Sequence, residues 1–115
     1  MKLNELKEKI DIDIENTLAR FGNMESFYIK FLKKFVDDKN FETLSEGIEK
    51  RDIKIVKESA HTLKGVAGNL GITRLYEISV KLMKIEELSW EEILTLYEDL
   101  KKEMEKTREI LKKLD

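Results

Sequence analysis

The chain has 115 residues, no cysteine and no proline, and 40% of its residues are charged, yet its formal net charge is only −2. This length suits one folded domain, which we expect to span residues 1–115. The balanced charge argues against a partner that is nucleic acid or an anionic membrane. The lack of cysteine excludes disulfides and thiolate metal sites, and no apolar run approaches the roughly eighteen residues of a membrane span.

Glutamate, lysine, leucine and isoleucine dominate and glycine is scarce, so the composition predicts an all-α fold. A short amphipathic segment leads into a helix over about 12–20, which should end near 21–23. The apolar residues of that segment are Leu3, Leu6 and Ile10. The pattern leaves open whether the apolar residues of the first helix face the core or a partner. These are Ile12, Ile14 and Leu18.

The second helix is predicted over about 24–38, with Asn23 as its cap, and the third over about 41–50, with Asn40 as its cap. The apolar face of the second helix is expected to carry Met24, Phe27, Phe31 and Phe35, with Tyr28 and Leu32 beside it. We expect five large aromatic side chains to lie in the core rather than at a partner surface. They are Phe27, Phe31, Phe35, Trp90 and Tyr97.

The fourth helix is predicted over about 53–70, between a capping Asp52 and Gly71, which stands where a left-handed terminating residue is expected. Its apolar stripe is Ile53, Val56, Ala60, Leu63, Ala67 and Leu70. A fifth helix should cover about 73–86. Its inward residues are Leu75, Ile78, Leu82 and Ile85.

The last helix is predicted to begin at a capping box formed by Ser89 and Glu92. Its apolar stripe is Trp90, Ile93, Leu94, Tyr97, Leu100, Met104, Leu111 and Leu114. Short connections favour antiparallel neighbours. We therefore predict an antiparallel up-and-down four-helix bundle with a short extra N-terminal helix or helices.

His61 is the only histidine, and it lies about 130° around the predicted fourth helix from the centre of its apolar stripe. It should therefore face solvent. The neighbours on its own face are either cationic or lack a side chain. They are Lys54, Lys57, Lys64, Gly65 and Gly68.

A solvent-facing imidazole can act as a base, a metal ligand or a nucleophile, and the neighbouring residues indicate which of these roles is favoured. A metal site needs more ligands than this face offers. A catalytic triad is not supported either, because Ser59 and Thr62 point to other faces of the helix. Lysines disfavour the imidazolium and would compensate an anion on the ring nitrogen, and a phosphoryl group fits that description. Lys64, one turn after His61, is the best placed.

Gly65 and Gly68 each cost a helix interior roughly 1 kcal/mol relative to alanine, so two on the histidine face call for a reason. Missing side chains would let a partner domain approach the imidazole closely, as in-line transfer of a phosphoryl group requires. Tight helix packing is the alternative reason, and Gly71 can be a helix terminator only.

The pattern His61-x-x-Lys64-Gly65 with Gly71 resembles the signature of histidine-containing phosphotransfer (HPt) domains. The similarity extends to the helix of Phe31, Leu32 and Phe35 and covers about residues 11–85. Val66 departs from the family, in which a small polar residue is common there. The final helix would complete the bundle.

The resemblance implies a phosphoryl carrier rather than an enzyme. His61 would accept a phosphoryl group from the aspartate of one response-regulator receiver domain and pass it to another, Lys64 would stabilise the group, and Gly65 would provide clearance. The chain would need no cofactor, because the receiver supplies the divalent metal. No phosphate-binding loop for ATP is present, so self-phosphorylation is not expected.

Other readings stay open at this point. The chain could be an adaptor that binds a receiver-like partner without being phosphorylated, or a phosphotransfer domain charged by a chemotaxis-type kinase. A hydrolase or metal site is a distant third. We expect a cytoplasmic monomer that stands alone, with receivers or a hybrid histidine kinase as partners.

Overall fold

The computed structural model describes all 115 residues, and its regular structure is entirely helical. Two short elements come first, the 3-10 helix η1 and the α-helix α1. The elements run in the order η1 (Leu3–Glu8), α1 (Ile14–Arg20), α2 (Glu25–Phe35), α3 (Asn40–Glu49), α4 (Ile53–Leu70), α5 (Thr73–Met83), the 3-10 helix η2 (Ile85–Glu87) and α6 (Trp90–Leu111).

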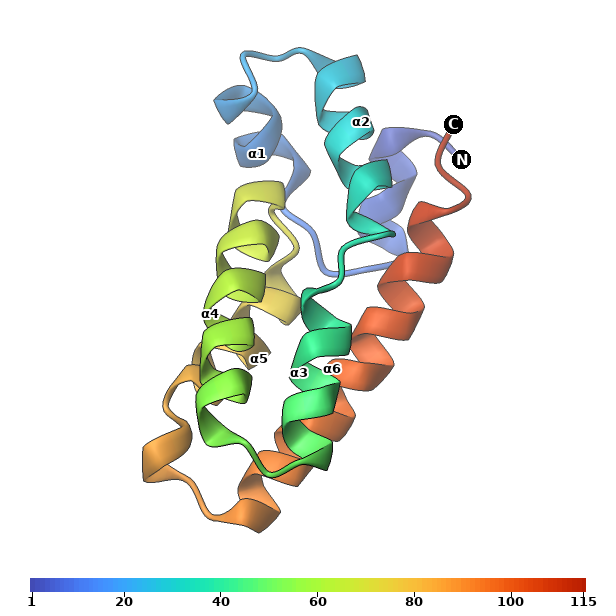
Figure 1. Ribbon diagram of the computed structural model, residues 1–115. Helices are drawn as coiled ribbons and strands as arrows, with labels where there is room; N and C mark the ends of the chain where they lie inside the picture. Colours follow the sequence, from blue (N-terminus) through green and yellow to red (C-terminus); the bar gives the residue numbers. More distant parts are fainter.

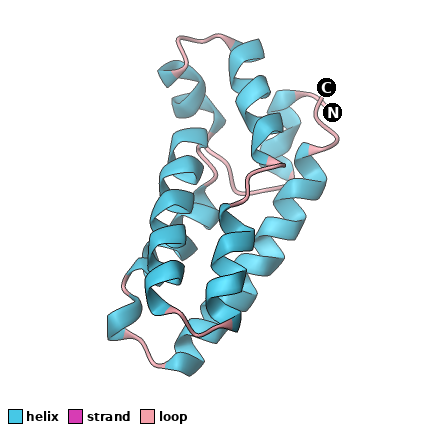
Figure 2. Ribbon diagram, in the orientation of Figure 1, coloured by secondary structure: helices cyan, strands magenta, loops and turns pink.

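Helices α3, α4, α5 and α6 run alternately down and up the long axis of the molecule (Figure 1). Helix α2 runs in the same direction as α3 and precedes it along that axis, and α1 lies at the same end as α2. The two termini meet, with the Met1 amino group 3.0 Å from the Asp115 carboxylate. Colouring by secondary structure shows helices and loops only (Figure 2). The predicted all-α, antiparallel up-and-down bundle with short extra N-terminal helices is confirmed.

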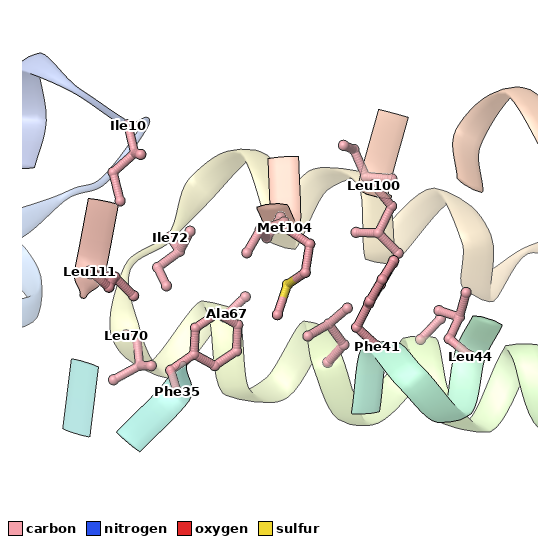
Figure 3. Close-up of a cluster of buried hydrophobic side chains, with 14 of the residues drawn as sticks. Ile10, Phe35, Phe41, Leu44, Ala67, Leu70, Ile72, Leu100, Met104 and Leu111 are labelled. Carbon is pink, nitrogen blue, oxygen red and sulfur yellow. The ribbon is translucent and has the colours of Figure 1, made fainter. Parts of the chain in front are cut away.

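The core is one continuous apolar cluster along the bundle (Figure 3). Met104 and Leu100 of α6 face α4 and α3, where Ala67 and Leu44 are fully buried. At one end Ile10 and Leu111 extend the cluster toward the N-terminal segment. The inner faces of helices α2 to α6 and the N-terminal segment therefore meet in a single core, which fixes the rotation of α4 about its axis.

Local signals set the ends of α4 and α6. The Asp52 carboxylate accepts a hydrogen bond from the Ile55 amide at 3.2 Å, and Gly71 ends α4 with a φ of 77°. The Ser89 hydroxyl accepts from the Glu92 amide at 3.1 Å, and the Glu92 carboxylate accepts from the Ser89 amide at 3.4 Å, which completes the capping box. The three predictions for Asp52, Gly71 and Ser89 are confirmed, and α4 covers the predicted residues 53–70.

The predicted caps of α2 and α3 are wrong. Asn23 has a left-handed conformation with a φ of 60° and is a turn residue in the loop before α2. Asn40 lies inside α3, and its amide donates to the Asp38 carboxylate at 2.9 Å. In both places the N-cap residue is a neighbour of the predicted asparagine, Met24 for α2 and Lys39 for α3.

The buried face of α2 also differs from the prediction. Tyr28, Leu32 and Phe35 are buried, whereas Phe27 is 42% exposed and Phe31 is 36% exposed. Met24, at the cap, is 53% exposed. Phe35 belongs to both the predicted and the observed face, so the buried face lies about 60° further around the helix than predicted. Expected core positions are therefore correct for Phe35 and wrong for Phe27 and Phe31.

A hydrogen bond gives the reason for this rotation. The Tyr28 hydroxyl donates to the Leu70 carbonyl at 2.6 Å, at the C-terminal end of α4, where helix carbonyls lack partners within their own helix. Burial raises the pKa of Tyr28 to about 12. Phe27 and Phe31 instead pack against each other with tilted rings, whose centroids are 5.1 Å apart, and both rings also pack against Phe21.

Smaller departures lie at helix ends and stripe edges. Ile53 is 45% exposed because it begins α4 at the end of the bundle, and Leu94 is 38% exposed at the edge of the α6 stripe. Helix α5 ends at Met83 rather than near 86, and Ile85 is buried from η2. Trp90 and Tyr97 pack against the core as predicted.

An ion pair ties α6 to α3. Arg108 donates two hydrogen bonds to the Glu42 carboxylate, at 2.6 and 2.9 Å, and a third to the Asp38 carbonyl at 2.6 Å. The bidentate contact with Arg108 holds the pKa of Glu42 below its usual range.

Candidate functional site

His61 lies in the middle of α4 and is exposed. The opposite face of the helix carries the residues that enter the core. Val56, Ala60, Leu63 and Ala67 are fully buried there. Because these residues fix the helix against its neighbours, the imidazole is presented to solvent from a rigid support.

The hydroxyl groups near His61 in the sequence are not available to it. Ser59 is buried, and the Thr62 hydroxyl donates to the Glu58 carbonyl at 3.2 Å. No group of three or more His, Cys, Asp or Glu side chains is placed to hold a metal ion. The residues one turn away from His61 along α4 are Lys57, Glu58, Lys64 and Gly65.

The three lysines on the His61 face of α4 differ in their partners. The Lys57 ammonium lies 2.8 Å from a carboxylate oxygen of Glu86, which belongs to η2. Lys54 and Lys64 form no ion pair within the chain. Lys64 is half-buried and lies one turn after His61. Of the two lysines without an ion pair, it is therefore the one nearer to His61 along α4.

The two glycines of this face also differ. A Cβ at Gly65 would meet nothing within 4 Å, whereas a Cβ at Gly68 would lie 3.1 and 3.3 Å from two ring carbons of Tyr76. The Gly68 carbonyl also accepts a hydrogen bond from Arg20 at 3.2 Å. Gly68 therefore has a packing reason within the chain, and only Gly65 leaves open space beside the histidine.

Gly71 does more than end the helix. Its carbonyl accepts from the Asp13 amide at 2.8 Å, and the Thr73 amide donates to the Asp11 carbonyl at 3.0 Å. A Cβ on Gly71 would lie 2.7 Å from the Asp13 carbonyl oxygen and would overlap the Thr17 hydroxyl. The glycine thus lets the N-terminal segment pair with the chain directly after α4. Sequence reasoning missed this contact.

The N-terminal segment also settles the three apolar residues left open above. Ile12, Ile14 and Leu18 are partly buried and pack against the core. The apolar side chains that remain exposed at this end belong instead to α2.

A groove of about 680 Å³ lies between α1, α2 and the last turns of α4. Phe21 and Phe31 supply aromatic surface to it, and Val66 and Asn69 line it from α4. Arg20, Lys34 and two aspartates add charge at its edges. Sequence reasoning missed this groove because it placed Phe31 in the core.

The chain belongs to the Hpt domain family, since the model of that family matches residues 31–110, more than half of the chain. The match begins later and ends later than the resemblance seen in the sequence, and it contains α4 and most of α6. Neither a curated protein nor a solved structure gives a significant match.

Membership places the protein in phosphotransfer of two-component signalling. Hpt domains are phosphocarriers rather than kinases, and they interact with receiver domains and kinases. No helix here combines the length and apolarity needed to span a membrane.

Proposed function

We propose that this chain is a phosphorelay intermediate whose phosphoacceptor is His61. The observation that supports this role most strongly is an exposed histidine on the rigid α4 helix of an Hpt domain, beside the open space at Gly65. The phosphoryl group would come from an aspartate of one response-regulator receiver and pass to another receiver.

The chemistry needs only the imidazole of this chain. A lone pair of one ring nitrogen attacks the phosphorus of the aspartyl phosphate, a P–N bond forms, and the P–O bond to the aspartate breaks. The electron pair of that bond stays on the aspartate as a carboxylate. Onward transfer is the reverse of this step with a second aspartate as nucleophile.

The neighbouring residues take supporting roles in this proposal. Lys64 stabilises the negative charge of the phosphoryl group, because its ammonium has no competing partner in the chain. Gly65 gives the receiver steric clearance. The partner would also contact Gly68, Lys57 and Lys54.

We further propose that the chain needs no cofactor and that the divalent metal belongs to the receiver. In this proposal the partners are response-regulator receivers, and a hybrid histidine kinase is a second partner. The net charge of −2 favours a protein partner over nucleic acid or an anionic membrane. In this proposal the protein works as a cytoplasmic monomer.

The test is to mix the protein with receiver domains charged by a small-molecule phosphodonor and Mg²⁺, and to follow labelled phosphoryl groups. We expect acid-labile, base-stable label on the wild type and none on His61→Gln. Thr62→Ala is the matched control, since its hydroxyl bonds only within the helix, and it should be labelled normally.

Two other outcomes would replace the proposal. Receivers that bind but never label His61, with unchanged binding to His61→Gln, would indicate an adaptor. Labelling by a chemotaxis-type kinase and ATP, but by no receiver, would indicate a kinase-charged domain.

A further inference from the structure

The ion pair between Lys57 and Glu86 is the only one that α4 forms. Lys57 lies one turn before His61, and Glu86 lies in η2, beside the first half of α4 (Figure 1). The pair therefore joins the helix that carries the histidine to the connection between α5 and α6.

The two lysines that flank His61 are consequently not equivalent. Residues four apart on a helix have Cβ atoms about 6 Å apart, so a Lys57 ammonium that left Glu86 could reach a phosphoryl group on the imidazole. Lys64, three residues after His61, has no such carboxylate partner. One flanking cation is free and the other is held.

The ion pair between Lys57 and Glu86 is weak enough for another anion to replace Glu86. The side chains of Lys57 and Glu86 are 43% and 65% exposed, and solvent-exposed ion pairs of this kind are only marginally stable. A phosphoryl group near neutral pH carries nearly two negative charges, against one for Glu86. Phosphorylation of His61 would therefore place a stronger anion within reach of the same ammonium.

We propose that Glu86 competes with the phosphoryl group for Lys57 and thereby shortens the lifetime of phosphorylated His61. This inference rests on the proposed function, since it assumes that His61 is phosphorylated. In the hydrolysis step, water attacks the phosphorus and the P–N bond breaks with its electron pair going to the ring nitrogen. One proton of the water passes to that nitrogen, and its OH becomes the new hydroxyl of the orthophosphate that leaves. Protonation of the ring makes the imidazole a better leaving group. A cation beside the phosphoryl group opposes this protonation and should therefore slow hydrolysis.

Glu86 is a positioning residue in this scheme, because it acts through Lys57. Its removal should lengthen the lifetime of the phosphohistidine by about threefold, the effect of one ammonium about 6 Å from a unit charge in water. Glu87 offers a matched control, since it lies in the same short helix, is exposed, and forms no ion pair.

The experiment charges the full chain on His61 with phosphoramidate, removes the donor, and follows the decay of the phosphohistidine signal by phosphorus NMR. The variants are Glu86→Gln, Glu87→Gln, Lys57→Gln and the double variant Glu86→Gln/Lys57→Gln. We expect slower decay for Glu86→Gln alone, wild-type decay for Glu87→Gln, and equal decay for Lys57→Gln and the double variant. Thermal unfolding of each variant checks that the fold is unchanged.

Unchanged decay in Glu86→Gln would overturn the inference, and so would slower decay that persists when Lys57 is also replaced. In the second case the carboxylate acts directly on the phosphoryl group and not through the lysine. A wild-type chain that is labelled but not at His61 would contradict the proposed function itself, so the two failures are distinguishable.

Discussion

Gly65 is the position at which stability and transfer should respond in opposite directions to one methyl group. A Cβ at Gly65 would contact nothing within 4 Å, so Gly65→Ala adds no clash inside the chain. Alanine in place of glycine in a helix stabilises it by about 0.5–1 kcal/mol. For a domain of this size that corresponds to a rise in melting temperature of about 2–5 °C.

The same methyl group should slow phosphotransfer from a receiver. It would stand one turn from His61, where the partner must come close for donor and acceptor atoms to align. A displacement of about 1 Å in such a geometry costs a factor of about 10 to 100 in rate. Charging by a small donor such as phosphoramidate should be unaffected, since the donor needs no such clearance.

The assay compares thermal unfolding with the rate of label transfer from a charged receiver. Gly47→Ala is the contrasting control, because a Cβ there would lie 2.9 Å from side-chain carbons of Ile55 and Val56 and should destabilise the protein. If Gly65→Ala transfers as fast as the wild type, the clearance argument is refuted. If it melts at a lower temperature, the open space at this position is refuted.

Three further perturbations test the fold around the site. Gly71→Ala places a Cβ at a φ of 77° and against the segment before α1, so thermal unfolding should show a loss of more than about 1 kcal/mol. The lowered pKa of Glu42 means that its pair with Arg108 stabilises the fold above pH about 4.5 and that this contribution is lost as pH falls through the folded pKa. Urea unfolding should therefore show a deficit of up to about 1 kcal/mol for Glu42→Gln near neutrality, given the exposure of the carboxylate, and a smaller deficit near pH 3. Phe35→Ala should cost about 3–5 kcal/mol by the same measurement and Phe27→Ala much less, because only the first ring is buried. An equal cost for the two phenylalanines would contradict the observed rotation of α2.

The sequence was most informative where the determining interactions are local. The boundaries of α4 follow from Asp52 and Gly71, which act within one turn of each end. The face of His61 follows from helical periodicity alone, so the lysines and glycines beside it could be named without a structure.

Prediction failed where a partner from another element decides. In α2, Phe27 and Tyr28 are adjacent, so either face could have entered the core by apolarity alone. The Leu70 carbonyl selects Tyr28, and that acceptor is distant in sequence. The partner of Lys57 could not be predicted either, because Glu86 reaches it only through the packing of η2 on α4.

The glycines near His61 look alike in the sequence but serve separate purposes in the fold. Gly65 faces open space, Gly68 accommodates the Tyr76 ring, and Gly71 accommodates the segment before α1. Helix α1 is fixed to α4 at two of these three positions, since Arg20 also donates to the Gly68 carbonyl.

The attachment of α1 to α4 determines which part of the chain forms the groove beside the last turns of α4. The family match begins at residue 31, yet Arg20 and Phe21 line the groove beside the last turns of α4. Hydrogen bonds at Gly68 and Gly71 hold that segment in place. The part of the chain that matches the family therefore carries His61. A segment outside the match forms part of the neighbouring groove, and its hydrogen bonds to Gly68 and Gly71 fix its position relative to α4.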